Sequence, residues 1–217
     1  MGFNAKNTLS RNAPKIQSKS TAEKVKFLQT LGQMLRFNIV ELLHDRGMIS
    51  LTQISNHMGS KMSDVSYALR QLLKAGIVFR QWEAQYMLYG LEQDAPVRLA
   101  TILDREPSSY TKHLPKMNGK QERMPEIDTA EKVEFLQALG NSMRFKIVQM
   151  LANGEELCVK DINARAGGTM EDTFYALSRL LKVNIVRKER EAQRMFHFFN
   201  EETYERLATI LDAKLHR

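Results

Sequence analysis

The chain has 217 residues, of which 43% are apolar, and a formal net charge of +7. No apolar run approaches the ~20 residues that span a bilayer. The first residues lack the apolar stretch of a signal peptide, and a single cysteine, Cys158, excludes a disulfide framework. These features predict a cytoplasmic protein that makes no contact with a membrane.

The first 20 residues carry a charge of about +4 and no acidic side chain. They are polar, aperiodic and rich in Asn and Ser, which predicts a disordered basic tail over 1–20. Such a tail serves either as a solubilising segment or as an arm that contacts phosphates.

The remaining sequence repeats itself at an offset of 108 residues. The stretch TAEKVKFLQTLG from Thr21 recurs as TAEKVEFLQALG from Thr129, and about 38 of the 84 aligned pairs up to residue 104 are identical. This period has the length of a domain, because solenoid repeats run to roughly 50 residues. The sequence therefore predicts two copies of one domain, which can pair as the halves of a dimer do.

Helical spacing of apolar side chains dominates the first copy. It predicts helices over 21–33, over 36–46, where Gly47 follows, and over 51–58, where Gly59 follows.

A fourth helix is expected over 63–75, with Gly76 after it. In the second copy, Thr169 and Asp172 predict a capping box for the corresponding helix.

Two β-rich runs, 77–82 and 86–91, predict a hairpin, and a last helix is expected over 96–105. The whole order is that of a winged helix-turn-helix, so the predicted fold class is mainly α with small β-hairpins (α+β).

The stretch LGQMLRFNIVELLHDRGMISLTQISNHMGSKMSDVSYALRQLLKAGIVFRQWEAQYMLYGL resembles the ArsR-type winged-helix repressors. Those proteins show a Leu-x-x-x-x-Arg-x-x-Ile-x-x-x-Leu opening, a reader helix ending in Leu-x-x-Ala-Gly-Leu-Val, and a wing ending in Tyr. The resemblance implies tandem winged-helix domains over 21–105 and 129–217, joined by a linker over 106–128. It also implies pairing through the first and last helices, within one chain as a pseudo-dimer or between chains in a homodimer.

The resemblance implies that the fourth helix enters the major groove of double-stranded DNA. In the first domain the expected contacts are Ser63, Ser66, Tyr67, Arg70, Gln71 and Lys74. Arginine pairs with guanine and glutamine with adenine, whereas Lys74 is placed nearer phosphate. The alternative is a solvated helix face with no ligand.

The second domain departs from this pattern. Glu171 and Asp172 favour the helix dipole but repel phosphate, and Phe174 replaces Ser66. The expected helix contacts there are Tyr175, Ser178 and Arg179.

The two wings also differ. The expected wing contacts are Arg187, Lys188, Arg190 and Arg194 in the second domain, but only Arg80 and Trp82 in the first. We expect Trp82 to fold back over its hairpin, the alternative being stacking on a sugar or a partner. Ala84 and Ala192 stand where the family has a turn glycine, so a differently shaped tip is expected. An asymmetric DNA site follows from these differences.

Metal sensing, which is common in that family, is not expected, and neither is a cofactor. ELCV at 156–159 matches the start of the family's metal box, but Lys160 stands at the second thiolate position. One thiolate does not build a soft-metal site alone. We expect Cys158 to be a buried apolar residue, with a redox-responsive thiol as the alternative.

The predicted function is therefore a sequence-specific DNA-binding transcriptional regulator without metal sensing. The sequence contains no phosphate loop, nucleophile elbow, paired carboxylates or zincin motif, so no enzyme is expected. Two alternatives stay open. One is an architectural, nucleoid-associated DNA-binding protein, and the other is a winged-helix module that binds proteins.

Overall fold

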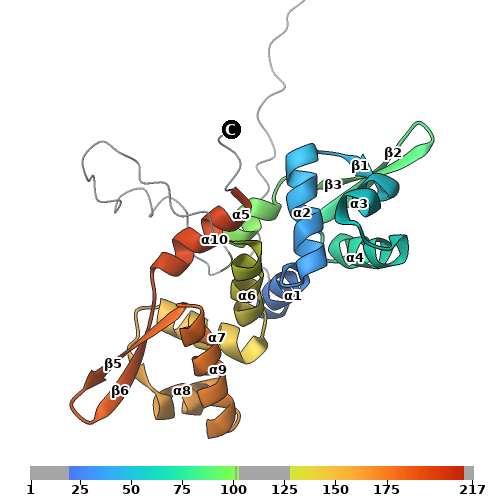
Figure 1. The fold of residues 1–217 in the computed structure, drawn as a ribbon. Helices are drawn as coiled ribbons and strands as arrows, with labels where there is room; N and C mark the ends of the chain where they lie inside the picture. The colour runs from blue at the N-terminus through green and yellow to red at the C-terminus, as the bar shows by residue number, and fades with distance from the viewer. Residues whose placement is uncertain (1–19, 101, 103–127, 213–217) are drawn as a thin grey trace, which may run out of the picture.

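The computed structural model describes residues 20–100, 102 and 128–212. The two copies contain the same elements in the same order, and a projecting hairpin precedes the last helix of each copy (Figure 1). The predicted tail and linker, apart from residues 20 and 128, lie outside the described residues.

The first copy follows the predicted order. Its elements are α1 (Thr21–Leu31), α2 (Met34–Arg46), β1 (Ile49–Ser50), α3 (Leu51–Met58), α4 (Met62–Lys74), β2 (Val78–Glu83), β3 (Tyr86–Leu91) and α5 (Ala95–Ala100). The predicted helix starts and hairpin strands agree with these bounds within two residues, while 101 and 103–105 lie outside the described residues. The strand β1 was not predicted, because two residues are too few to show the alternation that marks a strand.

The second copy repeats this order. Its elements are α6 (Thr129–Leu139), α7 (Ser142–Ala152), β4 (Leu157–Cys158), α8 (Val159–Ala166), α9 (Met170–Lys182), β5 (Val186–Glu191), β6 (Arg194–Phe199) and α10 (Glu202–Asp212). The short strand joins the hairpin in both copies, so the strand orders are β1-β3-β2 and β4-β6-β5.

Local signals end and begin the helices as predicted. Gly59 adopts a left-handed conformation (φ 58°) just after α3, where a side chain would be strained. The predicted capping box is present at α9, where the amide of Asp172 donates to Thr169 Oγ1 at 3.1 Å and the amide of Thr169 donates to Asp172 Oδ2 at 3.1 Å.

The first helices of the two copies pack against each other, and so do the last helices, α5 and α10 (Figure 1). A Cβ at Gly32 would lie 3.1 Å from the amide nitrogen of Gln137, and a Cβ at Gly140 would lie 3.1 Å from that of Gln29. These residues correspond at the 108-residue offset. Each glycine therefore allows the backbone of the other copy to approach closely. The two contacts are reciprocal, as in an interface with twofold symmetry.

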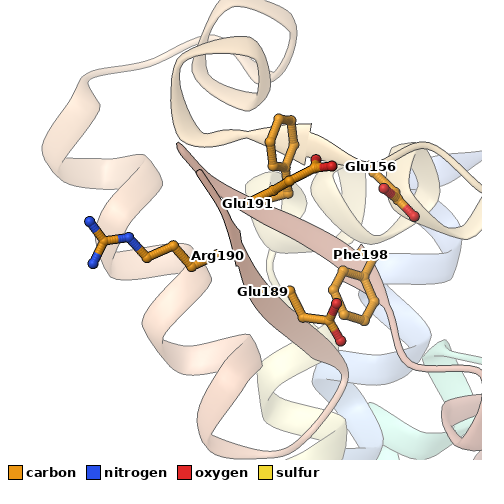
Figure 2. A pocket seen from close by; sticks show the side chains of 6 residues that line it. Glu156, Glu189, Arg190, Glu191 and Phe198 are labelled. Atoms are coloured by element: carbon orange, nitrogen blue, oxygen red, sulfur yellow. The ribbon is translucent and has the colours of Figure 1, made fainter. Parts of the chain in front are cut away.

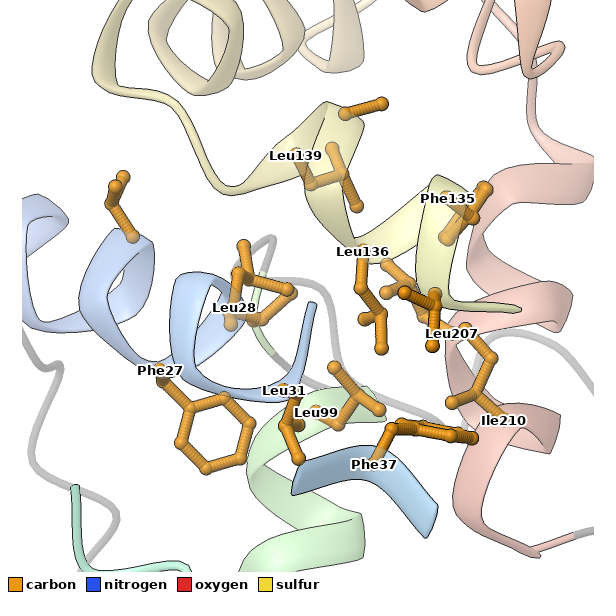
Figure 3. Packing of buried hydrophobic residues seen from close by; sticks show 14 of the residues in the cluster. Phe27, Leu28, Leu31, Phe37, Leu99, Phe135, Leu136, Leu139, Leu207 and Ile210 are labelled. Carbon is orange, nitrogen blue, oxygen red and sulfur yellow. The ribbon is translucent and has the colours of Figure 1, made fainter. Parts of the chain in front are cut away.

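A single apolar cluster runs through both copies at this contact. The residues labelled in Figure 3 are Phe27, Leu28, Leu31, Phe37, Leu99, Phe135, Leu136, Leu139, Leu207 and Ile210. A polar contact joins the copies as well, because Lys132 Nζ lies 2.9 Å from Glu41 Oε1 and the Thr129 hydroxyl donates to Glu41 Oε2 at 3.3 Å. A unit of this size is marginal alone, so the shared core stabilises both.

In the described part of the chain, no helix combines the length and the apolar character needed to cross a bilayer.

Candidate nucleic-acid interface

The α4 helix is anchored by one face and exposes the other. Val65, Ala68, Leu69 and Leu72 are buried in the core of the first copy. On the opposite side the predicted residues divide by exposure: Ser63, Tyr67, Arg70 and Lys74 are exposed, and Ser66 and Gln71 are half-buried. The structure therefore brings all six onto one accessible helix, as amphipathic spacing requires.

Internal contacts shape the α4 face. The Arg70 guanidinium lies 6.0 Å from the centre of the Tyr67 ring, which holds both side chains over one turn. The Ser63 hydroxyl donates to Asp64 Oδ1 at 3.3 Å. Lys74, within the described residues, forms no ion pair.

The α9 face exposes more apolar side chain than the α4 face. Phe174 and Tyr175 are exposed at 57% and 65% of their surfaces. Ser178 is exposed, but its hydroxyl already donates to the carbonyl of Tyr175 at 2.8 Å, and Arg179 is half-buried.

The two acids at the start of α9 have different roles. Hydrogen bonds from the side chain and backbone of Thr169 lower the pKa of Asp172, which is therefore held as the cap of its own helix. Glu171 is exposed and forms no hydrogen bond or ion pair among the described contacts.

The α4 and α9 helices also differ at their C-terminal ends. Lys182 Nζ lies 2.6 Å from Glu134 Oε1 on α6, and this hydrogen bond lowers the pKa of Glu134. The residues at the corresponding positions of the first copy are Lys74 and Lys26, both exposed cations. Lys182 is therefore held in an ion pair with a residue of α6.

An arginine near the start of α2 and its counterpart near the start of α7 make the same contact in both copies, and no role was predicted for either residue. Arg36 Nε donates to the carbonyl of Thr30, and Arg144 Nε donates to that of Ala138, both at 2.6 Å. Burial lowers the pKa of both guanidinium groups, although such groups stay charged. The signal in the sequence was the arginine of the Leu-x-x-x-x-Arg opening that resembles the ArsR-type repressors. In the structure this arginine caps the last carbonyls of α1 in the first copy and of α6 in the second.

The second wing has two unlike faces. Successive side chains of a strand point to opposite sides, so Lys188 and Arg190 share one face while Glu189 and Glu191 share the other. Figure 2 shows Arg190 pointing away from the side on which Glu189 and Phe198 lie. A hollow of about 440 Å³ is lined by Glu156, Glu189, Arg190, Glu191, Phe196 and Phe198. Its carboxylates repel phosphate, so the face with Lys188 and Arg190 is the one suited to DNA.

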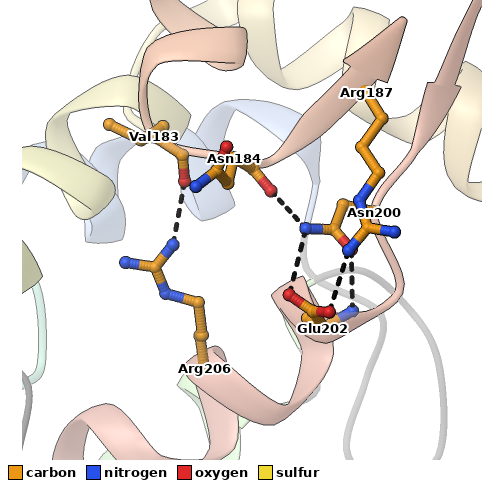
Figure 4. Close-up of polar contacts among 6 residues, drawn as sticks. All are labelled: Val183, Asn184, Arg187, Asn200, Glu202 and Arg206. Atoms are coloured by element: carbon orange, nitrogen blue, oxygen red, sulfur yellow. Dashed lines mark hydrogen bonds and ion pairs between the residues drawn. The ribbon is translucent and has the colours of Figure 1, made fainter. Parts of the chain in front are cut away.

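The cations of the second wing are not all free. Arg187 Nη2 lies 2.8 Å from Glu202 Oε1 on α10 (Figure 4), so this predicted contact is already paired. Lys188, Arg190 and Arg194 are exposed, and no ion pair holds them within the described ranges.

The same region connects the second wing to α10 (Figure 4). Asn200 Nδ2 donates to the carbonyl of Asn184 at 2.7 Å, and Arg206 Nη1 on α10 donates to the carbonyl of Val183 at 2.9 Å. In the first copy, Arg98 on α5 donates to the carbonyl of Gly76. Both turns between reader and wing are therefore held by the last helix.

The expectation for Trp82 is wrong. Its side chain is 66% exposed and does not fold back over the hairpin. Trp82 pairs with Met87 across the first wing as Arg190 pairs with Met195 across the second, so an aromatic ring replaces a cation in the same register. Arg80 is exposed on the same face of that wing.

The wing tips adopt a glycine-like conformation in spite of their alanines. Ala84 and Ala192 have φ values of 52° and 53°, in the left-handed region. The two-residue turn is therefore formed at the cost of some backbone strain.

The expectation that Cys158 is buried is also wrong. It is half-buried at the start of α8, and its Sγ donates to Asp161 Oδ2 at 2.9 Å. Exposed Lys160 stands where a second thiolate would be needed. Within the described residues no three His, Cys, Asp or Glu side chains gather to hold a metal ion.

Comparison with known proteins places this chain near one class of regulator. The sequence model of the MarR family matches residues 33–83, from the residue before α2 to the end of β2. The cadmium resistance transcriptional regulatory proteins CadC of Listeria innocua and Lactococcus lactis are each 28% identical over 86 residues, which is 40% of this chain and 72% of theirs. The putative arsenical resistance operon repressor ArsR2 of Halobacterium salinarum is 29% identical over 86 residues, 39% of this chain and 72% of that protein.

Two solved structures are similar over less than half of this chain. Reduced HlyU from Vibrio cholerae has a TM-score of 0.33 at 24% identity, covering 40% of this chain and 90% of HlyU. The homodimeric winged helix-turn-helix domain of Mb0332 from Mycobacterium bovis, a possible ArsR-family regulator, has a TM-score of 0.34 at 22% identity, covering 45% of this chain and 89% of that domain. From the sequence matches, the chain is similar to transcriptional regulators of the MarR/ArsR winged-helix type.

Proposed function

We propose that the chain is a sequence-specific double-stranded DNA-binding transcriptional regulator that acts in the cytoplasm on the nucleoid. It uses two non-identical winged helices, over 21–105 and 129–217, which pair within one chain as a pseudo-dimer. The observation that carries the proposal is the reciprocal contact of Gly32 with Gln137 and of Gly140 with Gln29. This contact fixes the position of the two exposed reader helices relative to each other, as an operator with half-sites ~34 Å apart requires.

The charges support the same proposal. The exposed cations suit phosphate contacts: Lys74 lies at the end of α4 in the first copy, and Lys188 and Arg190 share one face of the second wing. Arg187 and Lys182 are already paired inside the protein and contribute less.

Selection of bound duplexes from a random DNA pool tests this function. We expect one enriched motif with two unlike halves, bound ~10³ times more tightly than random DNA at the same salt concentration. Equal affinity for all sequences would instead support an architectural protein. Light scattering should give the 25.0 kDa mass of one chain at low concentration. Twice that mass would exclude a simple intrachain pair.

One observation favours a protein-interaction module as the second candidate. Trp82 and Tyr86 are 66% and 58% exposed at the first wing, where the second wing has arginines. Exposed aromatic side chains are enriched at protein interfaces. The absence of any DNA affinity at low salt would favour this candidate over a regulator.

A further inference from the structure

We infer that the second reader helix, α9, reads a pyrimidine step: the Phe174 ring packs on the C5-methyl group of a thymine, and the Glu171 carboxylate accepts a hydrogen bond from the N4 amino group of the neighbouring cytosine. This inference rests on the proposed function, because it names the bases that one half of the DNA site presents.

Phe174 is the first observation. Its ring is 57% exposed at a position where the first copy has the half-buried Ser66. A large apolar side chain on a surface that faces DNA needs an apolar group to cover it. In the major groove, the thymine methyl is the apolar group that a phenylalanine contacts.

Glu171 is the second observation. Its carboxylate is exposed and, unlike that of Asp172, takes no part in the cap of α9. A carboxylate accepts hydrogen bonds but donates none, so it repels phosphate and the acceptor edge of guanine. The N4 amino group of cytosine is the major-groove donor that suits it.

The spacing fits two adjacent bases. Residues three apart on a helix are neighbours on its surface and differ by ~4.5 Å along the axis. Stacked bases of one strand are ~3.4 Å apart. Both residues lie in the first turns of α9, which begins at Met170, and the N-terminal part of a recognition helix is the part that contacts base edges.

The α4 helix carries the opposite chemistry. Exposed Arg70 and half-buried Gln71 suit the purines guanine and adenine, and that helix exposes no phenylalanine. The two halves of the DNA site should therefore differ in base composition as well as in affinity.

Base analogues test the inference directly. In a selected duplex, each thymine is replaced in turn by deoxyuridine, which lacks only the methyl group, and affinity is measured by fluorescence anisotropy at fixed salt. Removing the methyl that Phe174 covers should weaken wild-type binding about fourfold, the value of one buried methyl group. The variant Phe174→Ser, which copies the first copy, should bind more weakly and lose all sensitivity at that one thymine.

Matched variants complete the design. Ser66→Ala should keep the full deoxyuridine effect, and Glu171→Ala should lose the preference for cytosine at the adjacent position in a repeated selection. All three substituted sites are exposed or half-buried, so thermal melting should show that all variants fold.

The outcomes separate the two proposals. Absence of DNA binding overturns the proposed function and this inference with it. Specific binding with no deoxyuridine effect, or with an equal effect in Phe174→Ser, overturns the inference alone. Unchanged DNA affinity and preference in Phe174→Ser would also overturn it and would assign the ring to a protein contact.

Discussion

The His197 side chain lies within the second wing sheet, where it is only 4% exposed. It pairs with Leu157 on one side and Lys188 on the other, and its Nδ1 has no hydrogen-bond partner among the described residues. Burial lowers the pKa of His197; a hydrogen bond with the backbone of Leu157 opposes this shift, and the charge of Lys188 adds to it. The folded protein therefore holds this imidazole in its neutral form.

This burial predicts an acid-sensitive wing. The unfolded chain takes up a proton near pH 6.5, whereas the folded chain resists it to a lower pH. The contribution of His197 to stability is thus fully present above pH ~6.5 and is lost as the pH falls through the lowered pKa. Urea unfolding between pH 7 and 5 should show a steeper loss of stability for the wild type than for His197→Gln. Exposed His57→Gln is the control, and equal slopes for wild type and His197→Gln would contradict the assignment.

Cys158 carries a second prediction at this scale. A lone half-buried thiol beside Lys160 does not supply the ligands of a soft-metal site. The affinity for the selected duplex should therefore be the same with and without micromolar Cd²⁺ in anisotropy titrations, and Cys158→Ser should behave as the wild type does. Release of the DNA by Cd²⁺ in the wild type but not in Cys158→Ser would show that the thiol senses metal.

At the scale of elements, the reader helices α4 and α9 share a backbone pattern but differ in which cations they offer. Lys182 is tied to Glu134 on α6, while the residues at the corresponding positions of the first copy, Lys74 and Lys26, are both cations and cannot form such an ion pair. Each cation that neutralises a phosphate adds about one unit to the slope of log affinity against log salt.

Lys74→Ala should therefore lower the magnitude of the salt slope by about 1. Lys182→Ala should change it less, since the side chain that is removed already has a partner. Anisotropy titrations at several salt concentrations measure both slopes. An equal change in the two variants would mean that the ion pair with Glu134 opens when DNA binds.

The wings show how one sequence position constrains another. A Cβ at Gly90 would lie 2.7 Å from Phe79 Cζ, so the ring of Phe79 occupies the place of a side chain there. In the second copy Phe198 stands at the glycine position and Arg187 at the ring position. The exchange frees Arg187 from packing and allows its ion pair with Glu202.

At the scale of the whole molecule, the contact between the copies is nearly but not fully symmetric. Glu41 forms an ion pair with Lys132 of the other copy, and the two side chains are only 21% and 10% exposed, respectively. The position that corresponds to Glu41 in the second copy is Gln149. The ion pair between the two copies is therefore not repeated at the symmetry-related position, where a neutral glutamine replaces the carboxylate.

Glu41→Gln should destabilise the chain by about 2 kcal/mol, because it leaves the Lys132 ammonium group largely buried without its charge partner. Urea denaturation measures the loss. Gln149→Glu is the matched control in the second copy and should not lower stability. Equal losses in the two variants would show that the effect comes from packing rather than from charge.

The sequence by itself determined the features that depend on neighbouring residues. The periods of the helices, Gly59 after α3 and the capping box of Thr169 and Asp172 all involve residues a few positions apart, and the 108-residue repeat is visible when the chain is aligned with itself. Capping and periodicity act within one or two turns, so such patterns carry their own physical cause.

Only the tertiary structure decided which exposed groups are free and how the copies meet. Lys182 and Glu134 are 48 residues apart in the sequence, and Gln137 and Gly32 are 105 residues apart. No local sequence pattern predicts either contact. The two-residue strand β1, the exposure of Trp82 and the half-burial of Cys158 escaped prediction for the same reason. Burial and pairing are properties of the space around a side chain, and distant segments of the chain fill that space.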